Sequence, residues 1–174
     1  MLVVLLLAVL PAALPPVPAA AVPAQVELLA NEEYGRALRD GIQQARSRIV
    51  ATFFLFKIGT GRHNLPRAVA DALIEARRRG VAVTVHLERP QGERDSLAVD
   101  NRDAGAYLSR GGVTVIPDSP AVTSHAKAVV IDDRFVFLGS HNLTQSALSH
   151  NNELSLRLDS PELAREILRY LERF

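Results

Sequence analysis

The chain has 174 residues, of which 48% are hydrophobic, and this is enough for one domain with a sizeable core. Twenty basic and 19 acidic residues leave a formal net charge of +1, so the overall charge does not indicate a polyanionic partner. There is no cysteine, which excludes disulfides, zinc fingers and thiol catalysis.

Residues 1–24 have the composition of an export signal. Residues 2–10 form a continuous apolar run, and the five prolines that follow prevent a regular helix beyond it. The run is too short for a good membrane span. Small residues before Val22 and Gln25 fit signal-peptidase cleavage, but no lysine or arginine precedes the run. We therefore expect a signal peptide and a periplasmic or secreted chain, with an uncleaved N-terminal anchor in the membrane as the alternative.

Strand and helix patterns alternate from residue 25 onward. Residues 26–30 predict a short strand, and Asn31 followed by two glutamates predicts a capped helix with apolar residues on one side. Residues 49–56 are apolar at nearly every position, which is typical of a central strand covered on both faces.

Two more helices and two more strands follow, in alternation. Asn64 marks the start of this helix, and Gly80 ends it after three arginines. Residues 81–87 predict a second buried strand. A helix around residues 101–109 then leads to another strand at 113–116.

The C-terminal part continues the alternation. Residues 143–147 predict a short helix, residues 154–158 alternate like a half-buried strand, and Ser160 begins a final helix. Together with an antiparallel hairpin, this pattern predicts the α/β fold class, an α/β/α sandwich on a mixed sheet. One domain should span residues 25–174.

The hairpin is predicted by two apolar, β-branched runs, at residues 124–132 and 135–142. A polar segment between them supplies the turn. We expect Asp133 and Arg134 to form a two-residue turn, although neither is the glycine that such turns prefer. A longer turn would shift the strand pairing by one residue.

Four polar side chains meet on one face in that register. His125 and Lys127 are two residues apart and point the same way. Lys127 would lie opposite Ser140, and His125 opposite Asn142. An imidazole, an ammonium, a hydroxyl and an amide in one patch suit a phosphoryl group.

This part of the chain also carries the residue pattern of a known superfamily. The pattern consists of His125, Lys127, Asp132, Gly139, Ser140, Asn142, Asn152 and Glu153. In this order and spacing it resembles the phospholipase D superfamily, also called the HKD phosphodiesterases, with one HKD motif per chain. The resemblance extends over nearly the whole chain after the leader, implies the same sandwich fold, and is greatest to the exported bacterial endonuclease branch.

The resemblance implies a role for each site residue. In that superfamily a histidine attacks phosphorus, a phosphohistidine forms, and a second histidine protonates the leaving oxygen. His125 would be the nucleophile, and Lys127 and Asn142 would hold the non-bridging oxygens. Ser140 would be a lesser phosphate contact. Glu153 would accept the other ring N–H of His125 and fix its tautomer.

Asp132 completes the motif, but we do not expect it to contact phosphate. Seven strand residues at about 3.3 Å each place it roughly 23 Å from His125, so we interpret it as a structural residue of the turn. No cofactor is expected. A metal site formed by His125, His141, His150 and Asp132 is disfavoured, since Lys127 would put an ammonium beside the cation.

The single motif predicts a homodimer. Lys57 and Lys127 are the only lysines, so no second His-x-Lys motif exists in the chain. Two hairpins facing each other across a two-fold axis would supply both histidines.

The motif indicates that the substrate contains a phosphodiester bond, but it does not indicate which molecule carries that bond. The expected substrate is DNA or RNA. A phospholipid head group is the alternative. A non-catalytic module that binds nucleic acid or a membrane is a second alternative, from a different class of function.

Overall fold

The computed structural model describes residues 21–61, 63–89, 95–119 and 121–172, so the expected leader at 1–24 lies almost entirely outside the described residues. The elements in chain order are β1 Gln25–Ala30, α1 Glu32–Gln44, β2 Arg48–Phe53, α2 Leu65–Arg78, β3 Ala82–Leu87, α3 Ser96–Arg110, β4 Thr114–Pro117, β5 Lys127–Ile131, β6 Phe135–Gly139, α4 Gln145–Ser149, β7 Leu154–Asp159 and α5 Pro161–Leu171.

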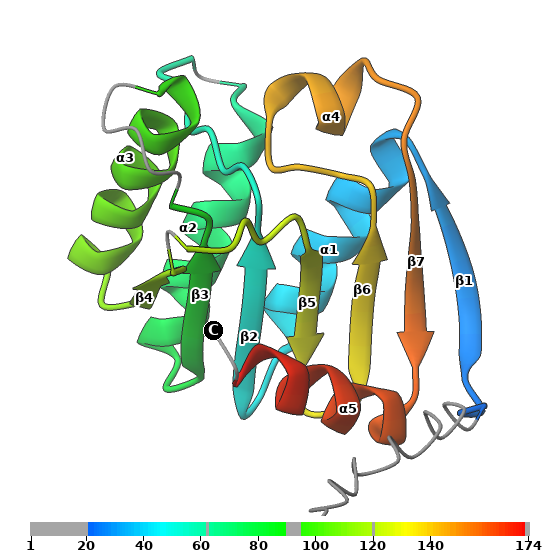
Figure 1. Ribbon diagram of the computed structural model, residues 1–174. Coiled ribbons are helices and arrows are strands. Elements are labelled where there is room, and N and C mark those ends of the chain that lie inside the picture. The colour runs from blue at the N-terminus through cyan, green and yellow to red at the C-terminus, as the bar shows by residue number, and fades with distance from the viewer. Residues whose placement is uncertain (1–20, 62, 90–94, 120, 173–174) are drawn as a thin grey trace, which may run out of the picture.

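Within the described residues, seven strands form one mixed sheet in the order β1-β7-β6-β5-β2-β3-β4. The neighbours β2, β3 and β4 run parallel, because a helix connects each to the next. All pairs that involve β5, β6, β7 or β1 are antiparallel. The predicted fold class, an α/β/α sandwich on a mixed sheet, is confirmed (Figure 1).

Helices cover the two faces of the sheet unequally (Figure 1). On one face α1 and α2 pack over a large core that includes Tyr34, Leu38 and Phe137. On the other face α5 packs over β5 and β6, where Val130 and Val136 contact it. Beyond α5, this second face of β7 and β1 carries no helix among the described residues (Figure 1).

Of the predicted helix starts, the caps at Asn64 and Ser160 are right and the cap at Asn31 is wrong. Asn64 caps α2, since its side-chain oxygen accepts the N–H of Arg67 at 2.9 Å. Asn31 has a left-handed backbone (φ 49°), and its side chain makes no capping hydrogen bond to α1. Its side-chain oxygen accepts the N–H of Glu153 instead, at 2.9 Å. A partner more than a hundred residues away thus replaces the local cap.

The hairpin between β5 and β6 differs from the predicted register by one residue. Ile131 lies opposite Phe135, so the turn has three residues instead of two. Asp132 and Asp133 both adopt the left-handed backbone (φ 53° and 56°). Aspartate tolerates this conformation better than most residues, which explains how the turn forms without glycine.

Asp132 leaves the strand because its carboxylate binds backbone elsewhere. It accepts the N–H groups of Arg46 (3.0 Å), Ser47 (2.8 Å) and Arg48 (3.2 Å), and the hydroxyl of Ser47 (2.8 Å). Burial raises the pKa of Asp132, but these donors outweigh burial and hold the pKa below its ordinary value. The carboxylate therefore fixes the start of β2 to the end of β5.

We predict that Asp132→Asn lowers the free energy of unfolding at pH 7 by about 1 to 3 kcal/mol, because the new amide group faces backbone donors. Asparagine keeps the left-handed backbone, so the change tests the carboxylate alone. Asp133→Asn is the matched control, since its ion pair with Arg48 is exposed and contributes under about 1 kcal/mol. Urea unfolding of both variants measures the difference.

The pH dependence has a defined sign. The folded pKa of Asp132 is lowered, so its stabilisation is complete above the unfolded value of about 3.9 and is lost as pH falls through the folded pKa. The stability gap between wild type and Asp132→Asn should therefore shrink below about pH 4. Equal effects of the two substitutions at pH 7 would contradict this role.

Candidate active site

The strand ends that carry or adjoin Lys127, Ser140, Asn142 and Glu153 meet at one edge of the sheet, which is the upper edge in Figure 1. At this edge β2, β3 and β6 end, and β5 and β7 begin. Strand ends place side chains from distant parts of the sequence next to one another. Asp132 lies at the other end of β5, away from this edge.

Lys127, the first residue of β5, lies against His125. Its Nζ donates to the His125 carbonyl oxygen at 2.7 Å and lies 3.2 and 3.3 Å from the two ring nitrogens. Lys127 is only 5% exposed, and burial lowers its pKa, while the nearby Glu153 carboxylate acts in the opposite direction. The chain thus buries a cation beside an imidazole.

Phe54 is a site neighbour that the sequence interpretation missed. Its ring centroid lies 4.4 Å from that of His125, and Lys127 Nζ lies 5.0 Å from the ring centroid. Phe54 follows β2, and no sequence signal separates it from the apolar run in which it stands. The ring forms one wall around the histidine and the lysine.

Glu153 and Ser140 form the second part of the site. The Ser140 hydroxyl donates to one oxygen of Glu153, and Asn151 Nδ2 donates to the other at 3.0 Å. Burial raises the pKa of Glu153, but these donors and the positive charge of Lys127 outweigh it, so the net shift is downward. Glu153 therefore stays ionised to lower pH than an ordinary glutamate.

The expected contact of Glu153 with the His125 ring does not form in the described chain. Its carboxylate is bound by Ser140 and Asn151, and its backbone by Asn31 through two hydrogen bonds of 2.9 and 3.0 Å. The charge of Glu153 acts on Lys127 rather than by direct contact with His125.

His141 is a buried support and not part of the open site. Its ring is fully buried and stacks on Tyr34 with centroids 4.4 Å apart. One ring nitrogen lies 2.7 Å from the Ser155 hydroxyl and the other 2.9 Å from the Asn31 carbonyl oxygen. Desolvation lowers the pKa of His141, which favours a neutral ring, and both contacts are compatible with that form.

The shifted hairpin register changes how Ser140 and Asn142 approach the lysine. Extended by one residue, the observed pairing puts Lys127 beside Gly139, so Lys127 and Ser140 do not share a face. The predicted common face is therefore wrong, because Asp132 turns out of the strand. Asn142 is half-buried just after β6, and its side-chain oxygen has no hydrogen-bond partner among the described residues.

Among the described residues, no three histidine, aspartate or glutamate side chains lie close enough together to hold a metal ion.

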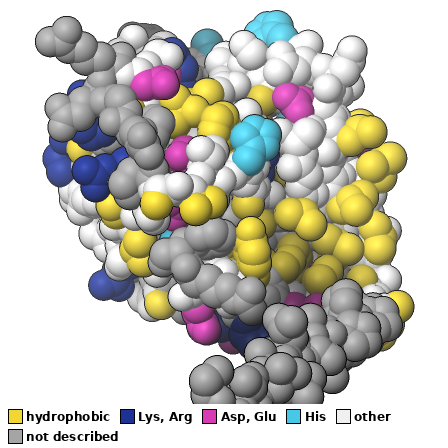
Figure 2. All heavy atoms as spheres, in the orientation of Figure 1, with side chains coloured by type: hydrophobic (Ala, Val, Ile, Leu, Met, Phe, Trp, Pro, Cys, Tyr) yellow, Lys and Arg dark blue, Asp and Glu magenta, His cyan; other side chains and the backbone are white. Residues whose placement is uncertain are grey.

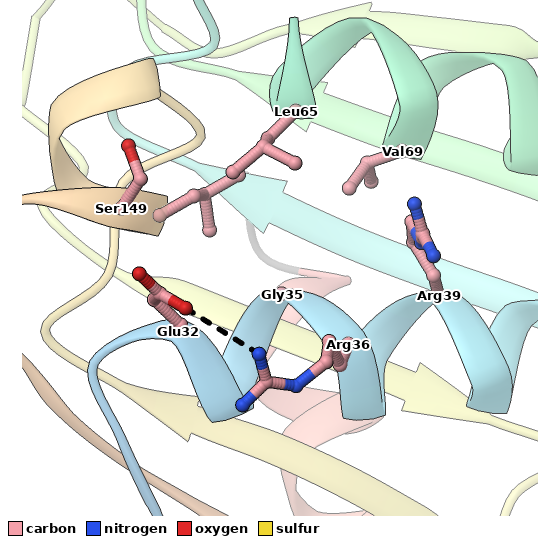
Figure 3. Close-up of a pocket in the computed structure, with 8 residues that line it drawn as sticks. Glu32, Gly35, Arg36, Arg39, Leu65, Val69 and Ser149 are labelled. Atoms are coloured by element: carbon pink, nitrogen blue, oxygen red, sulfur yellow. Dashed lines mark hydrogen bonds and ion pairs between the residues drawn. The ribbon is translucent and has the colours of Figure 1, made fainter. Parts of the chain in front are cut away.

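The structure also has a pocket away from this edge of the sheet. A pocket of about 260 Å³ between α1, α2 and α4 is lined by Glu32, Gly35, Arg36, Arg39, Leu65, Val69, Leu148 and Ser149 (Figure 3). None of the predicted site residues lines it.

Among the described residues, no helix is both long enough and apolar enough to cross a membrane.

Comparison with known proteins gives a family for most of the chain. A family model described as "Cardiolipin synthase, PLD-like domain" matches residues 38–174. The chain is 28% identical over 95 residues to the mitochondrial cardiolipin hydrolase of Chlamydomonas reinhardtii, a match that covers 55% of this chain and 40% of that protein. It is 30% identical over 100 residues to the phospholipase D of Rickettsia conorii, covering 58% of this chain and 47% of that one.

The chain therefore matches less than half the length of these two curated relatives. Among solved structures it is similar to Nuc from Salmonella typhimurium, a phospholipase D family member, with a TM-score of 0.71 and 22% identity. That likeness covers 87% of this chain and 93% of Nuc. At this identity it establishes the shared fold.

We predict that Lys127 releases its proton at lower pH than an ordinary lysine, whose pKa is about 10.4, because burial disfavours the ammonium. Lysine-selective labelling should give two side-chain NMR signals, from Lys57 and Lys127, since the chain has only these two lysines. Glu153→Gln removes a negative charge that favours the ammonium, so it should lower the pKa of Lys127 further.

Glu162→Gln is the matched control, because this exposed glutamate lies in the first turn of α5. It should leave the titration of Lys127 unchanged. A Lys127 titration that moved upward in Glu153→Gln, or did not move at all, would contradict the described charge pair.

Proposed function

The chain belongs to the phospholipase D-like family, and from this membership we propose that it is a metal-independent phosphodiesterase that forms a phosphohistidine intermediate. The observation that carries the proposal is the contact between Lys127 and His125. A nucleophilic imidazole with an ammonium 3.2 and 3.3 Å from its ring nitrogens suits attack on an anionic ester.

In the proposed reaction a ring nitrogen of His125 attacks phosphorus, and the bond from phosphorus to the leaving oxygen breaks. Lys127 and the amide of Asn142 hold the non-bridging oxygens as their charge grows. A second histidine protonates the leaving oxygen. It then takes a proton from water, which attacks phosphorus and releases His125. Ser140 is a further phosphate contact, and Glu153 keeps Lys127 charged.

The second histidine is proposed to come from a second copy of the chain, since one copy holds only one His-x-Lys motif. An exposed apolar face supports this homodimer. It is formed by Val26, Leu28, Leu138, Leu154 and Leu156, which we call the apolar sheet face.

The apolar sheet face has features of an interface. Leu28 pairs with Leu156, which pairs with Leu138, so the three side chains lie in one row across β1, β7 and β6. Leu28 and Leu154 are 61% and 60% exposed. Hydrophobic side chains gather on this side of the molecule in Figure 2. An antiparallel face left in water normally carries polar residues, so this one favours a protein partner.

For the substrate we propose nucleic acid, DNA or RNA. A single-motif chain resembles the bacterial endonuclease branch, and two arginines line a cavity that shares Glu88 with the segment before His125. Arg89 and Arg102 line a cavity of about 550 Å³ together with Glu88, whose carboxylate binds the backbone N–H of Ser124, the residue before His125. Arginines along such a cavity favour a polyanionic chain.

Phospholipid is the second candidate. The names of the two curated relatives, a cardiolipin hydrolase and a phospholipase D, favour it. The apolar sheet face next to Glu153 could also contact lipid. The alternative of a binding module without catalysis predicts no turnover and no phosphohistidine with any substrate.

We predict that the wild-type chain cleaves nucleic acid in the presence of EDTA and that His125→Asn lowers the rate by at least about 10³-fold with the fold intact. The assay offers plasmid DNA, single-stranded RNA, phospholipid vesicles and a chromogenic phosphodiester. His150→Asn is the matched control, since His150 is exposed and outside the motif. Cleavage of vesicles alone would select the lipid candidate, and inhibition by EDTA would contradict the mechanism.

We predict that Leu28→Arg and Leu154→Arg each convert a dimer to a monomer and lower activity by roughly 10²-fold or more, since a general acid is lost. Both residues are exposed, so the monomer should keep its thermal stability. Gln43→Arg adds the same charge to α1, on the opposite face, and serves as control. Sedimentation with parallel rate measurements tests this, and a fully active monomer would contradict it.

A further inference from the structure

We propose that Phe54 is a positioning residue for His125 and Lys127, and that Asn101 holds Phe54 in place. The inference rests on the proposed function only in taking His125 as the reacting group. Neither Phe54 nor Asn101 belongs to the motif, and the proposed reaction assigns them no step.

Phe54 contacts both reactive side chains at once. Its ring lies 4.4 Å from the His125 ring, tilted by 56°, which limits rotation of the imidazole on that side. Lys127 Nζ lies 5.0 Å from the centroid of the same ring. A cation over an aromatic face is stabilised, and this partly offsets the burial that disfavours the ammonium. One half-buried ring thus helps to orient the nucleophile and the cation.

Asn101 fixes the segment that carries Phe54. This residue of α3 is 3% exposed. Its Nδ2 donates to the carbonyl oxygens of Phe54 (2.9 Å) and Glu88 (2.8 Å), and its Oδ1 accepts the N–H of Phe56 (2.8 Å). The segment has left the β2 ladder here, so these backbone groups depend on the side chain. An asparagine supplies both the donors and the acceptor.

A second route leads from Asn101 to the nucleophile through Glu88. The Glu88 carbonyl is held by Asn101, and the Glu88 carboxylate accepts the N–H of Ser124 at 2.6 Å. Glu88 is 4% exposed, so this bond is shielded from water. Ser124 immediately precedes His125. The backbone of the nucleophile and the ring beside it are therefore fixed to one buried side chain.

The same segment also reaches the opposite side of the site. The N–H of Leu143 donates to the Leu55 carbonyl at 2.9 Å, and the N–H of Lys57 donates to the Leu143 carbonyl at 2.8 Å. Leu143 follows Asn142, the proposed phosphate contact. Asn101 thus links the two halves of the site, which come from distant parts of the chain.

The test uses two substitutions of Phe54. Phe54→Leu removes the ring but keeps an apolar side chain, and Phe54→Tyr keeps the ring. Phe135→Leu is the matched control. Phe135 is also half-buried and lies about 5 Å from the cationic groups of Arg134 and Arg157, but it begins β6 at the far end of the sheet.

An arm without substrate tests the geometry alone. An aromatic ring at this distance shifts the NMR signals of the His125 ring. Phe54→Leu should remove that shift, whereas Phe54→Tyr and Phe135→Leu should retain it. The serine side chain in Asn101→Ser is too short to make the three hydrogen bonds of Asn101, so this variant should weaken the shift of the His125 signals. If Asn101→Ser is folded and the shift is unchanged, Asn101 does not hold Phe54.

A kinetic arm tests the positioning role. Phe54→Leu should lower kcat by about 10- to 100-fold with little change in KM, because it displaces the nucleophile rather than the substrate. Phe54→Tyr should restore most of the rate, and Phe135→Leu should leave it unchanged. A raised KM with unchanged kcat would make Phe54 a substrate contact and overturn the proposal.

The two arms separate the possible failures. A wild-type chain with no activity on any phosphodiester would reject the proposed function, while the NMR arm would still decide the geometry. An active wild type whose kcat is unaffected by Phe54→Leu, although the ring shift is lost, would reject positioning. Should Asn101→Ser fail to fold, the two Phe54 variants and their control still decide the role of the ring.

Discussion

The antiparallel pairing of β5 with β2 decides where the site forms. Because β5 runs against β2, its first residue reaches the edge at which β2 and β3 end. Lys127 therefore meets Phe54, which follows β2, while Asp132 lies at the other edge beside the start of β2. The two ends of β5 thus carry motif residues with different roles. Lys127 belongs to the candidate site, and Asp132 stabilises the fold.

The sequence predicted the elements better than their junctions. Periodicity and caps identified the order of helices and strands, including the start of α2 at Asn64, because these signals are local. The hairpin register and the contact of Asn31 depend instead on partners 84 to 122 residues away. Local turn rules could not anticipate that Asp132 binds the backbone before β2. Phe54 and Asn101 were missed for the same reason, since only the folded chain brings them to His125.

The electrostatics of the site follow from burial rather than from net charge. The charges of the whole chain are nearly balanced, but Lys127 is only 5% exposed, and this burial lowers its pKa. The carboxylate of Glu153 and the face of Phe54 both favour the charged form of Lys127. A partly desolvated cation binds an anionic oxygen more strongly than an exposed one, because the local dielectric is lower.

The apolar sheet face connects assembly to chemistry in the proposed dimer. Leu154 directly follows Glu153, and the pairing of β6 with β7 places it opposite Ser140. The apolar sheet face therefore borders the candidate site. A dimer formed here would bury exposed leucines and bring the second histidine by the same association. Activity would then depend on protein concentration, since only the associated fraction carries a complete pair of histidines. The same hydrophobic contact would exclude water from the rim of the site, which strengthens the interactions of Lys127 with a bound phosphate.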